Sequence, residues 1–263
     1  DELILKNLGN EKQTPFITKL DMELAAIEKG GYDHFMIKEI HEQPDTIFDC
    51  LRGRLLPQTG QIIMSGVDNH IEALKNAQRI LIVACGTSWH AGLIAEYQIE
   101  ELCRIPVEVE YASEFRYRNA VVNKGDVIIA ISQSGETADT LVALESAKEK
   151  GAFIFGVVNA VGSSIARLSH AGAYTHAGPE IGVASTKAFT GQLAVLTMIA
   201  LKIGYAKGTI DEKRYLGLMK ELEAIPEKVK EILADTSNIQ RIAAKYKDAS
   251  DFLFLGRGYN FPV

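Results

Sequence analysis

Cysteine is scarce in this chain, and its few cysteines form no familiar pattern. Cys50, Cys85 and Cys103 are the only ones among 263 residues, and no two of them make a Cys-x-x-Cys pair. An odd, scattered set excludes a disulfide framework and favours a reducing compartment, so we predict a cytoplasmic location and no signal peptide. The six histidines show no metal-ligand spacing, and we expect no metal site and no cofactor.

Basic blocks and long apolar runs are also missing. Lysine and arginine number 28 against 34 acidic residues, which gives a net charge of -6 and argues against nucleic-acid binding. We expect the longest apolar stretches to be too short to cross a bilayer, and so expect no membrane contact. The remaining composition, 47% hydrophobic and 24% charged, is that of a globular protein with one large domain or two smaller ones.

Apolar strands alternate with helical patterns through the middle of the chain. Residues 79–85 form a continuous apolar run, the pattern of a strand that is covered on both faces. Further strands are predicted at residues 107–111, 127–132, 153–158 and 173–175, and helices at 89–102, 136–150 and 186–203. This alternation predicts βαβ units. We therefore expect an α/β fold, a three-layer α/β/α sandwich around a five-stranded parallel sheet with flanking helices.

The regions before and after this domain are polar and helical. Residues 1–78 are predicted to be a mostly helical lead-in that packs on the main domain, with no repeated apolar strand. Its helices are expected near residues 21–29, 34–41 and 45–54. Residues 205–250 are predicted to be a helical linker, which Pro226 kinks or splits.

Both ends of the sequence suggest a piece of a longer protein. The first residue is Asp1 rather than methionine, and residues 251–256 repeat the strand-and-glycine pattern of residues 79–85. We therefore expect a main domain at residues 79–204. Residues 251–263 are expected to be the truncated start of a second copy of that domain.

Hydroxyl groups and glycines gather where two predicted strands end. Residues 85–88 are Cys-Gly-Thr-Ser, and residues 132–137 are Ser-Gln-Ser-Gly-Glu-Thr. Ligands of open parallel sheets bind beyond the carboxyl ends of the strands, so the two loops would share a site if their strands are adjacent. Helix N-termini, glycine and hydroxyls suit a phosphate, although neither loop has a lysine or arginine. The alternative is that these residues only form turns and helix caps.

A third irregular loop covers residues 178–187 and contains two glycines and a proline. Ser185 or Thr186 is expected to cap the helix that follows. The sequence allows three roles for Glu180: a charge in solvent, a partner for a sugar hydroxyl, or an anchor for the loop.

Other catalytic motifs fit this sequence poorly. Ser134 lacks the leading glycine of a Gly-x-Ser-x-Gly nucleophile elbow. The absence of Gly-x-Gly-x-x-Gly after the first strand, and of a P-loop, disfavours a nucleotide-dependent oxidoreductase. Cys85 is expected to pack in the core rather than to act as a reactive thiol. His90 either faces a ligand or lies on the helix surface.

Four segments together resemble one enzyme family. They are CGTS at residues 85–88, ASEFRYR at 112–118, SQSGETADTL at 132–141 and EIGVASTKAFT at 180–190. The similarity runs along nearly the whole chain, from MIKEIHEQP to FLFLGRG. The chain resembles the first sugar-isomerase (SIS) domain of the glutamine–fructose-6-phosphate aminotransferases, or glucosamine-6-phosphate synthases, and this resemblance implies a flavodoxin-like fold.

The resemblance also implies a sugar-phosphate site. Enzymes of this family use a glutaminase domain to release ammonia and two SIS domains to convert fructose 6-phosphate into glucosamine 6-phosphate. Carried over by motif, one set of residues would hold the phosphate and another would lie along the sugar. The phosphate set is Ser88, Ser132, Gln133, Ser134 and Thr137, and the sugar set is Thr87, Val183 and Ser185.

The family's catalytic groups, by the same resemblance, belong to segments outside these residues. They are a nucleophilic cysteine, a Schiff-base lysine, and the Glu, Lys and His of the isomerase step. We therefore expect the chain to bind fructose 6-phosphate or glucosamine 6-phosphate without turning it over, and expect a homodimer. The alternative is a non-catalytic sugar-phosphate sensor, although residues 1–78 show no basic DNA-recognition helix of the kind that sensors usually carry.

Overall fold

The computed structural model describes residues 5–6, 12–13 and 28–263. The first two segments form an antiparallel pair, β1 (Leu5–Lys6) and β2 (Lys12–Gln13). The helix expected near residues 21–29 lies almost wholly outside the described residues.

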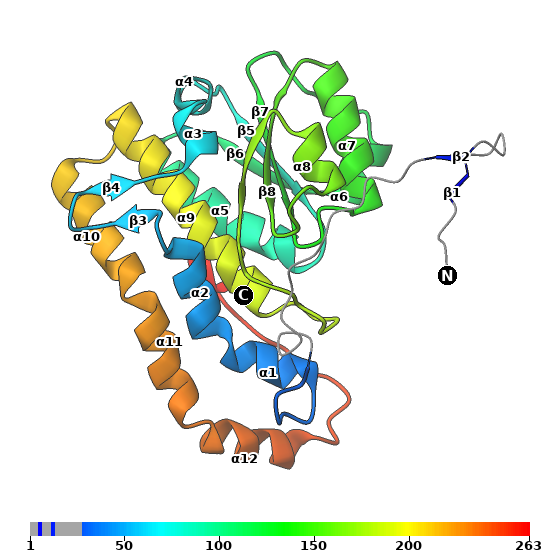
Figure 1. The fold of residues 1–263 in the computed structure, drawn as a ribbon, viewed down its shortest axis with the longest axis vertical. Helices are drawn as coiled ribbons and strands as arrows, with labels where there is room; N and C mark the ends of the chain where they lie inside the picture. The colour runs from blue at the N-terminus through cyan, green and yellow to red at the C-terminus, as the bar shows by residue number, and fades with distance from the viewer. Residues whose placement is uncertain (1–4, 7–11, 14–27) are drawn as a thin grey trace.

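A five-stranded parallel sheet forms the centre of the fold (Figure 1). Its strands are β5 (Ile80–Ala84), β6 (Val107–Tyr111), β7 (Val127–Ser132), β8 (Phe153–Val158) and β9 (Ala171–Tyr174). The order β6-β5-β7-β8-β9, with all neighbours parallel, is the flavodoxin-like order 2-1-3-4-5. The predicted α/β fold and its five strands are confirmed, although the last strand begins two residues earlier than expected.

Helices cover both faces of the sheet and complete the three layers (Figure 1). Successive side chains of a strand point to opposite faces, so Ile80 and Ile82 join one core cluster and Leu81 and Val83 the other. The first cluster includes side chains of α5 (Thr87–Cys103) and α9 (Lys187–Lys207). The second includes side chains of α6 (Ala112–Tyr117), α7 (Ala138–Glu149) and α8 (Ser164–Leu168). Every residue of β5 and β7 is buried, which explains their continuous apolar sequences.

The lead-in packs, as predicted, on the face of the sheet that α5 and α9 cover. Its elements are α1 (Phe35–His41), α2 (Gln43–Leu51), β3 (Leu55–Leu56), β4 (Gln61–Ile62), α3 (Ser65–Asp68) and α4 (Ile71–Lys75). Ile47 and Leu51 of α2 belong to the same core cluster as α9. The sequence predicts no repeated apolar strand here, and the structure adds a short antiparallel hairpin of β3 and β4. Strands of two residues are too short to show an alternating pattern in the sequence.

The expectation that every apolar stretch is too short to cross a bilayer is wrong for helix α9. The helix has 21 residues, and an 18-residue window within it has a mean hydropathy of 1.3, so it is long and apolar enough to cross a bilayer by length and composition. In the fold, however, 67% of that stretch is buried inside the protein. The helix packs against α5 and α2, so its apolar character is explained by its place in the core.

The C-terminal region is helical up to Tyr246. It contains α10 (Glu212–Glu223), α11 (Ile225–Ala234) and α12 (Ser237–Tyr246), and the predicted break at Pro226 is confirmed at the start of α11. The strand expected at residues 251–256 is wrong, since Phe252 is 61% exposed and Leu255 87% exposed outside any strand. A strand is stable only beside a partner, and within the described chain this segment pairs with none. A 3-10 turn, Gly258–Asn260, follows it.

Candidate functional site

A cavity of about 360 Å³ lies beyond the carboxyl ends of β5 and β7. The two strands are neighbours, with Ala84 beside Ile131, so the loops that follow them meet at one edge of the sheet. The loop before α9 adds a third wall. All eight residues that sequence reasoning selected line this cavity: Thr87, Ser88, Ser132, Gln133, Ser134, Thr137, Val183 and Ser185.

The first wall is the start of α5. Gly86 precedes the helix with φ of 57°, a conformation that glycine adopts without steric cost. No side chain of the described residues caps α5, so the positive end of a 17-residue helix faces the cavity. Ser88 is buried, and its Oγ accepts a hydrogen bond from Nε2 of Gln192 on α9 at 3.0 Å. Because the Ser88 oxygen accepts this bond, its own proton is available to donate into the cavity.

The second wall is the loop after β7, whose hydroxyls are held by the loop itself. Ser132 Oγ accepts the N–H of Gly135 at 3.0 Å and lies 3.2 Å from Thr137 Oγ1. Ser134 Oγ accepts the N–H of Glu136 at 3.2 Å. Thr137 stands at the N-cap position of α7, yet no side chain of the described residues caps that helix. The helix-cap interpretation is therefore wrong for these hydroxyls, and the first turn of α7 is left open toward a ligand.

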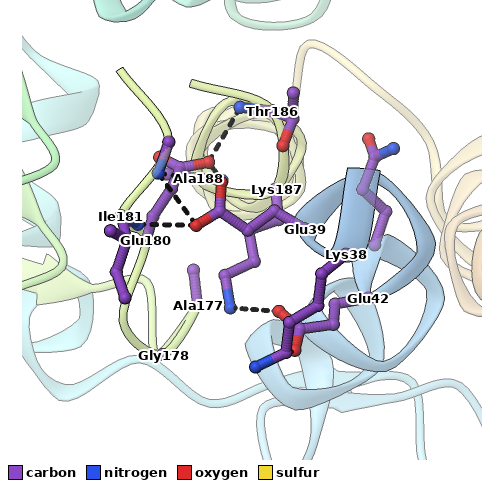
Figure 2. Close-up of polar contacts among 12 residues, drawn as sticks. Lys38, Glu39, Glu42, Ala177, Gly178, Glu180, Ile181, Thr186, Lys187 and Ala188 are labelled. Carbon is purple, nitrogen blue, oxygen red and sulfur yellow. Dashed lines mark hydrogen bonds and ion pairs between the residues drawn. The ribbon is translucent and has the colours of Figure 1, made fainter. Parts of the chain in front are cut away.

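The third wall is fixed by Glu180, which anchors the loop. Glu180 Oε1 accepts the N–H group of Thr186 at 2.8 Å (Figure 2) and that of Ala188 at 3.2 Å. Its Oε2 accepts the hydroxyl of Ser185 at 2.8 Å. The expected capping of α9 by Ser185 or Thr186 is thus wrong, because the carboxylate caps the helix instead. A carboxylate is the stronger cap at a helix start, since its charge also opposes the positive end of the helix dipole.

The cavity offers neutral donors for a small anion. Among the described residues that line it, none is a lysine or an arginine. Hydroxyl groups and two uncapped helix starts supply the polarity, which is the arrangement that binds phosphate without a cationic side chain. Its volume of about 360 Å³ lies at the lower end of the range for small-molecule sites. A sugar phosphate is of that size and charge.

The family comparison agrees with this geometry. The SIS domain profile matches residues 73–202, a range that contains all three walls of the cavity. Residues 73–202 of this chain belong to the SIS domain family.

Sequence alignments with named relatives extend over nearly the whole length of this SIS chain. It is 57% identical to the glutamine–fructose-6-phosphate aminotransferase (isomerizing) of Bacteroides thetaiotaomicron over 262 residues, which are 100% of this chain and 43% of that protein. It is 45% identical to the enzyme of the same name from Saccharomyces cerevisiae, over 95% of this chain and 35% of that protein. The SIS chain thus spans less than half the length of these relatives.

A solved structure with the same architecture carries a related name. It is the C-terminal domain of glucosamine-fructose-6-phosphate aminotransferase from Francisella tularensis, with a TM-score of 0.83 and 40% identity. The match covers 89% of this SIS chain and 65% of that one.

Other residues singled out in the sequence have different places around the SIS cavity. Cys85 packs against the second core cluster as expected, but it is only partly buried and also lines the cavity. His90 places Nδ1 2.7 Å from the carbonyl oxygen of Pro262. Glu136 is not among the lining residues, because its Oε1 accepts the N–H of Ser164 at 2.7 Å. Hydrogen bonds from the side chain and from the backbone N–H of Ser164 lower the pKa of Glu136 and hold its negative charge at the start of α8.

A second cavity of the SIS chain, about 420 Å³, is larger but chemically different. It lies among α2, α5, α9, α10 and α11, and apolar side chains such as Leu193, Leu218 and Val229 form most of its wall. Its arginine, Arg214, is already paired with Glu101. An anion would find few donors there, so the smaller cavity is the better candidate for a phosphate.

Proposed function

We propose that this chain binds a sugar phosphate as part of a glutamine–fructose-6-phosphate aminotransferase. The ligand would be fructose 6-phosphate or glucosamine 6-phosphate. One observation carries the proposal: the eight residues of three separate loops line one cavity at two uncapped helix starts. The names and identities of the relatives support the same substrate class.

Each wall has its own role in this proposal. The phosphate would lie against the starts of α5 and α7, where five residues supply hydroxyl, amide and backbone donors. These are Ser88, Ser132, Gln133, Ser134 and Thr137. Thr87, Val183 and Ser185 would lie along the sugar. A charge-assisted hydrogen bond contributes about 1.5–3 kcal/mol, so a few of them suffice to hold a dianion.

The chain is proposed to supply the anchor for catalysis rather than the reacting groups. Moving a proton between C1 and C2 of a ketose requires a positioned general base and a stabilised oxyanion. The described residues that line the cavity include no carboxylate, histidine or lysine. Phosphate binding would then orient the reacting carbons for groups that the rest of the parent enzyme provides. On this proposal the chain alone binds its ligand without turning it over.

We also propose the organisation that the sequence suggested: lead-in to residue 78, SIS domain at 79–204, helical linker at 205–250, and the start of a second SIS domain at 251–263. A homodimer remains part of the proposal. A cytoplasmic location does too, and the free thiols of Cys50, Cys85 and Cys103 support it.

Thermal unfolding with added ligand tests the proposed function. Fructose 6-phosphate at 100 times its Kd should stabilise the fold by about 2.7 kcal/mol. For a chain of this size that corresponds to a rise in Tm of roughly 5–10 °C. Glucosamine 6-phosphate should act similarly, and NAD should leave Tm unchanged. A rise with NAD and none with either sugar phosphate would reverse the conclusion.

Replacing single hydroxyls tests the second wall. Ser134→Ala and Thr137→Ala should each weaken fructose 6-phosphate binding roughly tenfold or more, because each removes a donor to the phosphate. Isothermal titration measures the effect, and unfolding curves should stay nearly unchanged. Ser146→Ala, farther along the same helix and outside the cavity, is the matched control. Normal binding by both site variants would show that this loop does not hold the phosphate.

A further inference from the structure

The lead-in reaches the cavity's third wall through one buried carboxylate. Glu39 on α1 is 3% exposed. Its Oε1 accepts the N–H of Ile181 at 2.6 Å and the N–H of Gly182 at 3.0 Å (Figure 2). The residues joined by these bonds are 142 and 143 positions apart in the sequence. A remote helix therefore holds the backbone just before Val183.

The Glu39 carboxylate lies so close to the backbone of Gly182 that it leaves no room for a side chain there. A Cβ added at Gly182 would lie 2.5 Å from Glu39 Oε2, closer than any side chain tolerates. Its own N–H also lies 3.2 Å from that oxygen. Gly182 is not in a left-handed conformation, so close approach to Glu39 is the reason for a glycine at this position.

Helix α1 is buried on its charged side. Its buried residues are Lys38 and Glu39, whereas Met36 is 43% exposed and Ile37 is 38% exposed. A helix that serves packing alone buries its apolar side and leaves its charges in water. Burying a carboxylate costs free energy unless it is well bonded. The position of Glu39 is therefore explained by its two backbone partners rather than by packing.

A second buried contact joins the residue after α1 to the start of α9. Lys187, the first residue of α9, is 5% exposed, and its Nζ lies 2.7 Å from Glu42 Oε2 (Figure 2). Two carboxylates then bracket the exposed tip of the loop. Glu39 holds residues 181–182 before it, and Glu180 holds residues 185–186 after it. Val183 between them is fully exposed, so neighbouring side chains do little to hold it.

We propose that Glu39 is a positioning residue that sets the place of Val183 and Ser185 against the sugar. This inference rests on the proposed function, because it concerns the sugar side of the same cavity. The walls at α5 and α7 are held by other hydrogen bonds, within the loop after β7 and between Ser88 and Gln192 of α9, and none of these involves Glu39. Loss of Glu39 should therefore affect recognition of the sugar and spare recognition of the phosphate.

The test compares two ligands on the full 263-residue chain. Glu39→Gln replaces two equivalent acceptors with one acceptor and one donor, and the donor opposes the N–H groups of the loop. Fructose 6-phosphate should bind this variant roughly tenfold more weakly. Inorganic phosphate, followed by NMR titration, should bind as it does to the unaltered chain. Glu100→Gln is the matched control, since Glu100 Oε1 also accepts a backbone N–H, that of Val107 at 3.1 Å, and Glu100 is not among the residues that line the cavity. It should leave both affinities unchanged.

Amide hydrogen exchange provides a readout of the bonds themselves. The N–H groups of Ile181 and Gly182 should exchange faster in Glu39→Gln and at the normal rate in Glu100→Gln. If Glu39→Gln does not fold, Gly182→Ala serves instead, because its added Cβ displaces the same carboxylate. It should likewise weaken the binding of fructose 6-phosphate and leave the binding of inorganic phosphate unchanged.

Three results would overturn the proposal. Equal weakening of both ligands would mean that Glu39 supports the whole site or the fold. Unchanged binding of fructose 6-phosphate, with faster exchange, would mean that the loop position does not matter for the sugar. Failure of the unaltered chain to bind fructose 6-phosphate would reject the proposed function first, and this inference with it.

Discussion

Gly135→Ala is expected to cause the largest loss of both stability and ligand binding. Gly135 has φ of 65°, and an added Cβ would lie 2.1 Å from Ser163 Oγ and 2.5 Å from Ser163 Cβ. A left-handed alanine costs about 1–2 kcal/mol, and overpacking adds about 1–3 kcal/mol. Together they predict a fall in Tm of roughly 5–15 °C. Fructose 6-phosphate binding should fall more than tenfold, because the N–H of Gly135 is bonded to Ser132 Oγ at 3.0 Å.

Two further variants separate the backbone strain from the clash. Gly151 follows the other end of α7, has φ of 88°, and its Cβ would meet nothing within 4 Å. Gly151→Ala should therefore cost only about 1–2 kcal/mol and leave ligand binding unchanged. Adding Ser163→Gly to Gly135→Ala should recover the packing part of the loss. If Gly135→Ala is no worse than Gly151→Ala, the loop adapts freely and Ser163 does not restrict it.

The parts of the fold that were predictable depend on local pattern. A strand covered on both faces reads as a continuous apolar run, so residues 79–85 and 127–132 could be recognised without knowing their neighbours. The adjacency of β5 and β7 then followed from the order of the sheet. Polar residues at the ends of those strands were brought to one cavity for the same reason.

The parts that escaped prediction depend on distant contacts. Glu39 lies in residues 34–41, where the sequence pattern predicts a helix but assigns no role to this carboxylate. Its partners are more than a hundred positions away, and no periodicity points to them. The strand expected at residues 251–256 failed for a related reason. An apolar run followed by glycine indicates a capacity to form a strand, but a neighbouring strand must satisfy its backbone.

Glu180 shows how one local pattern permits several outcomes. Its loop has glycines, a proline and two hydroxyl residues before a helix, which is sufficient to predict a helix start near Thr186. Serine, threonine or a nearby carboxylate can each satisfy the first N–H groups of a helix. The choice depends on how the chain turns at Pro179, and that conformation is set by the surrounding fold.

Glu180→Ala is accordingly expected to damage the third wall more than any hydroxyl replacement. The carboxylate accepts bonds from Thr186 and Ala188 and from the hydroxyl of Ser185. Losing the cap of a long core helix should cost about 2 kcal/mol of unfolding free energy. Ser185 loses its partner at the same time, so fructose 6-phosphate affinity should fall roughly 10- to 100-fold. Inorganic phosphate, which needs only the α5 and α7 walls, should bind nearly as before.

Asp211→Ala is the matched control for this loss. Asp211 is the N-cap of α10, where its Oδ1 accepts the N–H of Arg214 at 2.7 Å, and it is not among the residues that line the cavity. Its removal should cost about 1 kcal/mol and leave fructose 6-phosphate binding intact. Chemical denaturation and isothermal titration on both variants measure the two effects separately. If Glu180→Ala matches Asp211→Ala in both measurements, Glu180 acts only as a helix cap, and Ser185 does not depend on it to meet the sugar.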